Sequence, residues 1–100
     1  MNILLVCASG MSTSLLVTKM QKASEESGSQ DTIFACSVDE LEMHIDDCEV
    51  VLIGPQIRYK SKIISEIAAA KNKGFAVIDS VSYGMVDGKK VLAQAYQFKK

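Results

Sequence analysis

The feature that most constrains the fold of this 100-residue chain is a repeated alternation of short apolar runs with longer amphipathic segments. The apolar runs predict strands over residues 2–7, 32–36, 50–53 and 75–78. The runs over residues 2–7 and 50–53 are continuous and apolar, as is typical of strands that are buried on both faces of a sheet, whereas residues 32–36 predict a weaker strand. The alternation therefore predicts an α/β fold: an open parallel four-stranded sheet with helices on both faces and right-handed crossovers. We expect the strand order 2-1-3-4.

Helix boundaries are suggested by capping residues. Helices are expected over about 13–27 and 60–73, with a short one opening near Ser37 and a last one near Asp87. Ser37 and Glu40 have the spacing of a capping box, and Asp87 is a good N-cap residue. Gly28 and Gly74 stand where glycine is expected to end the two longer helices.

Composition narrows the class of protein. The mass of 10.9 kDa and the absence of a linker or repeat predict a single domain over residues 1–100. The formal net charge of −1 gives no sign of a nucleic-acid or membrane-binding patch. Since no apolar run approaches the ~20 residues of a membrane span and the start lacks a basic segment, we expect a cytoplasmic protein. Three cysteines, Cys7, Cys36 and Cys48, show neither metal nor redox spacing.

The predicted fold indicates where a ligand would bind. In open α/β sheets, ligands bind beyond the carboxyl ends of the strands. Cys7, Gly54-Pro55 and Asp79-Ser80 all follow predicted strands, so they are expected along one edge.

The segment after the first strand carries the chemistry. It begins with a nucleophile, Cys7, which we take as the catalytic residue. The candidate phosphate-binding residues are Ala8, Ser9, Gly10, Met11, Ser12, Thr13 and Ser14. Gly10 allows the backbone to wrap around a ligand, and the helix that follows offers unpaired amides and a positive dipole end. Helix N-termini also stabilise thiolates, which are the nucleophilic form of cysteine.

Other functions fit this segment less well. A cysteine-loop phosphatase or arsenate reductase would need C-x5-R, whose arginine clamps the phosphate, and here that position is Thr13. An FMN or phosphometabolite sensor is a third class, although the chain has no tryptophan and few aromatic residues for stacking a flavin. The loop is therefore suited to hold a phosphoryl group without hydrolysing it.

The residues then point to a family. The segment CASGMSTSLLVTKM resembles the phosphocysteine loop and first helix of enzyme IIB components of the bacterial sugar phosphotransferase system. It is most similar to the lactose/cellobiose (chitobiose) group, whose loop typically reads C-S-A-G-M-S-T-S. The segments VVLIGPQIRY and VIDSVSYGMVDG also resemble this group, and the likeness spans nearly all 100 residues, residues 30–49 being the least distinctive part.

This resemblance implies a protein-phosphohistidine–sugar phosphotransferase. Cys7 would accept a phosphoryl group from a histidine-phosphorylated IIA protein. It would then donate the group to a β-glucoside or disaccharide bound by the membrane IIC permease. No metal or other cofactor is implied, and the sugar is not identified because IIC binds it.

The remaining candidates are assigned more ordinary roles. His44, the only histidine, is expected to be a plain surface residue. Cys36 and Cys48 are expected to be structural, with a regulatory disulfide to Cys7 as the alternative. Whether residues 55–59 and 79–83 contact the phosphate or a partner is left open, and Asp79 is expected to cap or orient its loop.

Overall fold

The computed structural model describes residues 1–7 and 11–98, with residues 11–13 described by their backbone alone. The strands β1 (Asn2–Cys7), β2 (Thr32–Ser37), β3 (Val50–Ile53) and β4 (Gly74–Val77) form a parallel four-stranded sheet in the order β2-β1-β3-β4. The predicted fold class and strand order are therefore confirmed. All these strands run in one direction, so their carboxyl ends share one edge of the sheet.

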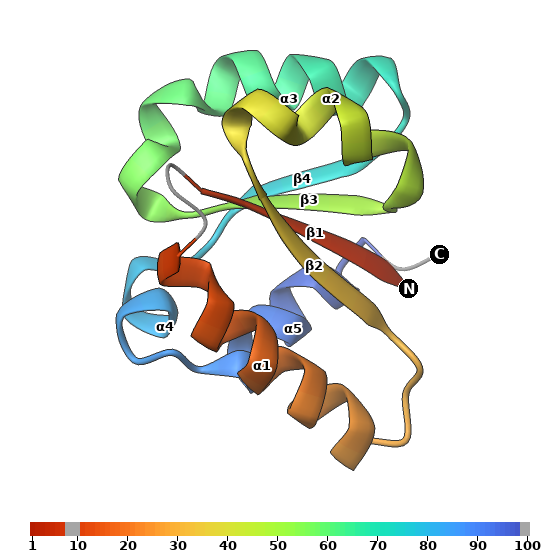
Figure 1. Cartoon of the computed structure of the whole chain (residues 1–100), viewed down its shortest axis with the longest axis vertical. Helices are drawn as coiled ribbons and strands as arrows, with labels where there is room; N and C mark the ends of the chain where they lie inside the picture. Colours follow the sequence, from red (N-terminus) through yellow and green to blue (C-terminus); the bar gives the residue numbers. More distant parts are fainter. Residues whose placement is uncertain (8–10, 99–100) are drawn as a thin grey trace.

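Helices cover both faces of this sheet (Figure 1). On one face lie α1 (Met11–Glu26), α4 (Ser80–Gly84) and α5 (Gly88–Tyr96). On the other face lie α2 (Leu41–His44) and α3 (Ser61–Ala70). Three 3₁₀ segments complete the described elements: η1 (Val38–Glu40), η2 (Ile45–Asp47) and η3 (Pro55–Lys60).

The core forms two layers because successive strand residues point to opposite faces. Ile3 and Leu5 of β1 belong to the cluster beneath α1 and α5, whereas Leu4 and Val6 belong to the cluster beneath α2 and α3. All of these side chains are fully buried. Burial on both faces explains why β1 is an unbroken apolar run rather than an alternating one.

The first long helix ends as predicted. Gly28 has a φ of +76°, which is easily adopted by glycine. The backbone N–H of Ser29 donates to the carbonyl of Ser24 (3.0 Å), and that of Gly28 donates to Glu25 (3.1 Å). This pair of bonds is a Schellman motif.

The prediction that Gly74 ends the next long helix is wrong. Helix α3 ends at Ala70, and Asn72 takes the left-handed conformation with a φ of +60°. Its N–H donates to the carbonyl of Ala69 (3.1 Å), while the N–H of Lys73 donates to Ala68 (2.8 Å). Asparagine tolerates this conformation better than most residues, so Gly74 is left to begin β4.

Two local predictions also need correction. Ser37 makes no capping bond to the backbone; its hydroxyl donates instead to the carboxylate of Glu40 (3.2 Å). The short helix predicted there is divided into η1, α2 and η2. Helix α4 was not predicted, because only one turn of helix separates its cap, Asp79, from the next loop.

Candidate functional site

Cys7 is the last residue of β1 and lies at the carboxyl edge of the sheet. It pairs in register with Ser37 of β2, while the preceding Val6 pairs with Cys36 and with Ile53 of β3. Its side chain is 2% exposed, and its thiol lies 4.0 Å from the carbonyl oxygen of Cys36. The candidate nucleophile is thus placed at the centre of the edge, between two flanking strands.

Helix α1 starts at Met11, a few residues after Cys7. The predicted phosphate-binding residues Ala8, Ser9 and Gly10 lie outside the described residues. Met11, Ser12 and Thr13 form the first turn of the helix, which carries no acidic side chain. The unpaired amides and the positive dipole end of α1 therefore lie close to Cys7 in sequence, with no carboxylate in the turn to repel an anion.

Ser14, the last predicted phosphate-binding residue, is exposed. Its carbonyl accepts a hydrogen bond from the hydroxyl of Thr18 (3.1 Å), an ordinary bond within the helix. The described contacts of Ser14 are therefore those of a helix residue.

The segments that follow β3 and β4 meet at the same edge. The N–H of Gly54 donates to the carbonyl of Val6 (3.0 Å), which extends the β1–β3 pairing beyond the strand. A methyl group added at Gly54 would lie 3.5 Å from the ring of Tyr83 in α4. The segments that follow β1, β3 and β4, which were predicted to lie along this edge, are therefore brought together there.

Asp79 caps α4, which agrees with the expectation that it caps or orients its loop. Its carboxylate accepts hydrogen bonds from the backbone N–H and the hydroxyl of Ser82, both at 3.0 Å. These bonds lower the pKa of Asp79, the backbone bond contributing most. Asp87 caps α5 in the same way, accepting from the N–H of Lys90 (3.2 Å).

Large apolar side chains are exposed on the segments that follow the strands at this edge. They are Leu15 in the second turn of α1, Tyr59 in η3 and Val81 in α4. Tyr59 is the most open of them at 76% exposure. Tyr59 and Val81 lie in the segments 55–59 and 79–83, whose contacts the sequence left open, whereas Leu15 was not singled out. Leu15 could have been found because it lies off the buried face that Leu16 and Met20 define.

The other two cysteines belong to the core beneath α2 and α3. Burial raises the pKa of both Cys36 and Cys48 to about 11. Because neighbouring strand residues point to opposite faces, Cys36 shares the face of Val6 whereas Cys7 points to the other side. All three cysteines are described and no disulfide joins them, so a structural role for Cys36 and Cys48 is favoured over a disulfide with Cys7.

His44 is not the plain surface residue that we predicted. It is half-buried, and its ring packs edge-on against Phe34 at a centroid distance of 6.0 Å and an interplanar angle of 71°. The residues that the structure describes include no cluster of three histidine, cysteine or acidic side chains placed to hold a metal ion. Within the same residues, no helix is long and apolar enough to cross a membrane.

Known proteins resemble the chain over nearly its full length. Residues 2–94 match the family described as "PTS system, Lactose/Cellobiose specific IIB subunit". The oligo-beta-mannoside-specific EIIB component of Bacillus subtilis (strain 168) is 43% identical over 93 residues, covering 93% of this chain and 90% of the relative. The cellobiose-specific EIIB component of Lactococcus lactis subsp. lactis (strain IL1403) is 40% identical over 98 residues, covering 93% and 91%.

Solved structures agree with this comparison. The solution structure of a cellobiose-specific phosphotransferase IIB component from Borrelia burgdorferi has a TM-score of 0.81 and 39% identity, covering 97% of this chain and 89% of that one. The lactose-specific IIB domain of Streptococcus pneumoniae has a TM-score of 0.88 at 11% identity, covering 100% and 98%, which shows a shared fold. The chain thus belongs to the lactose/cellobiose-specific IIB family, the phosphotransferase components that work with IIA and IIC proteins in sugar uptake.

Proposed function

We propose that this protein carries a phosphoryl group on Cys7, taking it from the phosphohistidine of a IIA protein and passing it to a sugar held by the membrane IIC permease. The position of Cys7 carries the proposal: it ends the central strand β1 at the carboxyl edge, just before the start of α1. The whole chain, residues 1–100, acts as one carrier domain on the cytoplasmic side of the membrane.

Each transfer exchanges one bond to phosphorus for another. In the first step, the thiolate of Cys7 attacks the phosphoryl group, the N–P bond of the phosphohistidine breaks and an S–P bond forms. In the second step, a sugar hydroxyl attacks, the S–P bond breaks and an O–P bond forms, and the hydroxyl proton leaves to a base or to water at the permease. Positioning and charge stabilisation supply the catalysis, because phosphoryl transfer needs little covalent help from the protein.

Residues 8–14 are proposed to hold the phosphoryl group through backbone amides and hydroxyl groups. The first turn of α1 supports this role, since it offers unpaired amides and carries no acidic side chain. Thr13 stands where a cysteine-loop phosphatase would place arginine, so the loop lacks the guanidinium clamp of a hydrolase. A carrier benefits from this absence, because the phosphocysteine must survive until the sugar is in place.

Exposed apolar groups around the edge support transient docking of the two partners. Leu15, Tyr59 and Val81 lie on segments that follow β1, β3 and β4. A partner that reaches Cys7 must cover this edge, and burial of these side chains would stabilise a modest, reversible contact.

The sugar is proposed to be a β-glucoside or another disaccharide chosen by the permease. Relatives of closely similar identity, 40–43%, are named for oligo-beta-mannoside, galactose and cellobiose. Different sugar names at nearly equal similarity support the view that this component does not select the sugar.

Intact-mass spectrometry tests the proposal. The protein is incubated with phosphoenolpyruvate, the general phosphotransferase proteins and a cellobiose-type IIA, and is analysed at neutral pH. We expect one phosphoryl adduct in the wild type and in Cys36→Ala, and none in Cys7→Ser. Addition of permease-bearing vesicles and cellobiose should remove the adduct.

Two results would contradict the proposal. An adduct that persists in Cys7→Ser would exclude Cys7 as the acceptor. Sustained hydrolysis of an aryl phosphate or of its own adduct, without sugar, would favour a phosphatase instead of a carrier.

A further inference from the structure

An open groove runs between the α2 segment (residues 38–44, which form η1 and α2) and α3, on the face of the sheet opposite α1 and α5. Its volume is about 340 Å³. Apolar side chains form its floor: Val38, Leu41, Ile64 and Ile67. Leu41 and Ile64 are each only 1% exposed, so the floor is part of the core and its shape is fixed by packing.

Two of its lining residues place one end of this α2–α3 groove near the edge that holds Cys7. Val38 follows Ser37, the register partner of Cys7 on β2. At the other wall, Lys60 ends the 3₁₀ segment η3 that follows β3. The groove is therefore bounded by the two segments that leave the strands on either side of β1, and a protein seated on the Cys7 edge could extend a segment into it.

Ile63 gives the groove an apolar surface that is exposed to solvent. It lines the groove, yet 62% of its side chain is exposed. Its neighbour Ile64 is buried in the core beneath, so the helix carries two consecutive isoleucines of which only one is buried. An apolar side chain of a partner that covers Ile63 would remove apolar surface from water, which favours binding.

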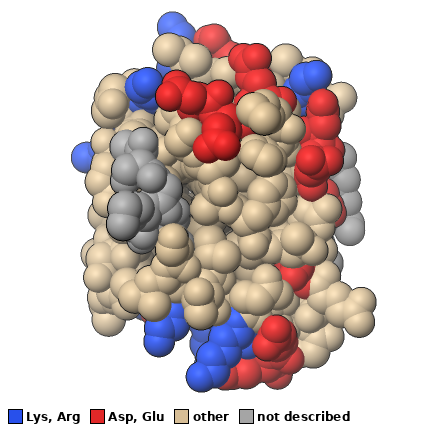
Figure 2. All heavy atoms as spheres, in the orientation of Figure 1, with Lys and Arg blue, Asp and Glu red and all other residues tan. Residues whose placement is uncertain are grey.

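The charge of the groove indicates what kind of segment fits. Asp39 and Glu42 line the side formed by the α2 segment, with the exposed Glu40 beside them, and Lys60 is the only cation among the described residues that line the groove. Figure 2 shows acidic side chains gathered over the α2 segment in the upper part of the view. A segment that carries lysine or arginine next to an apolar side chain would complement both the wall and Ile63.

One of the two partners is expected to present such segments. Cytoplasmic loops of membrane proteins carry an excess of lysine and arginine, because these charges set the orientation of the spanning helices. A histidine-phosphorylated protein outside the membrane is under no such constraint. We infer that the α2–α3 groove binds a basic cytoplasmic segment of the membrane permease, an inference that rests on the function proposed above.

The groove between α1 and α5 provides a contrast. It has a similar volume, about 380 Å³, but it is lined by Glu26 and Ser27 at the far end of α1 and by Tyr96 at the end of α5. These residues lie toward the amino edge of the sheet, since Tyr96 bonds to Asp31 just before β2. A partner bound there would not reach Cys7, so this face supplies the control.

When the two half-reactions are measured separately, a defect in binding the permease can be distinguished from a defect in binding the phosphoryl donor. Two groove variants are tested separately. Asp39→Lys/Glu42→Lys reverses two exposed charges on the groove wall, and Ile63→Ser removes the exposed apolar side chain. The control is Glu25→Lys/Glu26→Lys, the same charge change at exposed positions on α1. Acceptance is measured as the rate of adduct formation from phosphorylated IIA, and delivery as phosphorylation of labelled cellobiose by inside-out vesicles that carry a cellobiose-type permease.

We expect the groove variants to accept the phosphoryl group at the wild-type rate. In delivery, the KM for the phosphorylated double variant should rise about tenfold or more, because like charges would then face each other. Ile63→Ser should raise it less, and the α1 control should leave it unchanged. Unchanged delivery by the groove variants would overturn the inference, as would equal losses in both half-reactions. A wild type that accepts no phosphoryl group would instead overturn the proposed function.

Discussion

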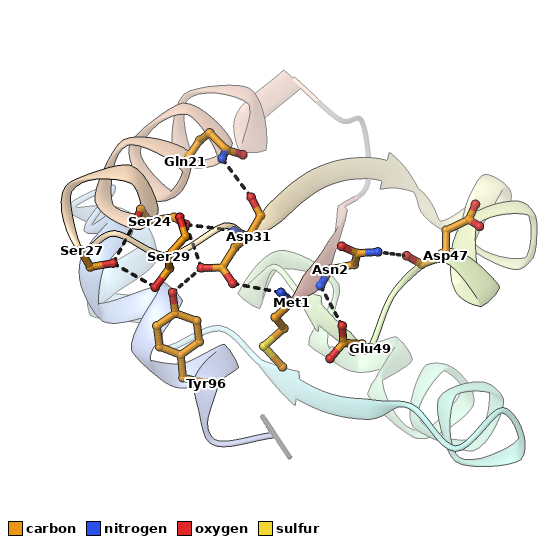
Figure 3. Close-up of polar contacts among 10 residues, drawn as sticks. All are labelled: Met1, Asn2, Gln21, Ser24, Ser27, Ser29, Asp31, Asp47, Glu49 and Tyr96. Carbon is orange, nitrogen blue, oxygen red and sulfur yellow. Dashed lines mark hydrogen bonds and ion pairs between the residues drawn. The ribbon is translucent and has the colours of Figure 1, made fainter.

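The α-ammonium group of Met1 lies 3.2 Å from Oδ1 of Asp31, and each side chain is only 1% exposed. The other carboxylate oxygen of Asp31 accepts hydrogen bonds from Ser24 (2.8 Å) and from the hydroxyl of Tyr96 (Figure 3). This cluster joins the start of β1 to the ends of α1 and α5 and to the segment before β2. It lies at the amino edge of the sheet, opposite the edge that holds Cys7.

Substitution of Asp31 should strongly destabilise the fold. Asp31→Asn keeps the shape of the side chain but leaves a buried ammonium group without its counter-charge, which costs about 3–5 kcal/mol. The control is Asp46→Asn, which removes an exposed ion pair with Lys71 (3.7 Å) and should cost less than about 1 kcal/mol. Urea denaturation measures both, and equal losses would show that the cluster contributes no more than a surface pair.

The same carboxylate should make stability depend on pH. Burial alone would raise the pKa of Asp31, but hydrogen bonds from Tyr96 and Ser24 and the charge of Met1 outweigh it and hold the pKa below its ordinary value. A group whose pKa is lowered by folding stabilises the protein above its unfolded pKa, about 3.9 for aspartate, and loses that contribution as pH falls through the folded value. The difference in unfolding free energy between wild type and Asp31→Asn should therefore shrink below about pH 4.

Urea titrations at several pH values between neutral and strongly acid test this dependence. The neutral-pH gap between the two proteins serves as the reference. A gap that stays constant down to the acid end would contradict the assigned role of the Asp31 carboxylate.

Two glycines form a matched pair for testing helix packing. A Cβ at Gly88, the first residue of α5, would lie 2.5 Å from the carbonyl carbon of Lys19 and 2.7 Å from the backbone nitrogen of Met20. Because both contacts are to the backbone of α1, Gly88→Ala should force the helices apart and cost about 1–3 kcal/mol. Gly84, the last residue of α4, has no neighbour among the described residues within 4 Å of its Cβ position. Gly84→Ala should be neutral or stabilise by up to about 1 kcal/mol. Thermal denaturation of the two variants decides, and equal effects would contradict the close approach.

The fold could be predicted because the two strands at the centre of the sheet carry a strong local signal. Val50–Ile53 is apolar throughout, and its burial on both faces in the centre of the sheet matches that pattern. Helix ends were harder, because several residues can adopt the left-handed conformation: Gly28 does so as predicted, but Asn72 does so in place of Gly74. The Asp31 cluster has no local signal, since its members are far apart in sequence and only the packed fold joins them.

Part of the site could likewise be predicted from the sequence and part could not. Cys7, Gly54 and Asp79 were placed together because parallel strands share a carboxyl edge. The α2–α3 groove was not predicted, because it depends on how η1 packs against a helix that follows a different strand. Ile63 appears in the sequence as one of several isoleucines of an amphipathic helix, and only its exposure in the fold distinguishes it.

The thiols of Cys36 and Cys48 should be inert while the protein is folded. A pKa of about 11 leaves roughly one thiol in a thousand ionised at pH 8, against about one in four for a free thiol. Both side chains are also buried beneath α2 and α3. In Cys7→Ser, iodoacetamide at pH 8 should therefore label neither cysteine without denaturant and both in urea, as counted by intact mass. Rapid labelling of the folded variant would mean that this part of the core opens readily, and it would make these thiols competitors of Cys7 for oxidants and electrophiles.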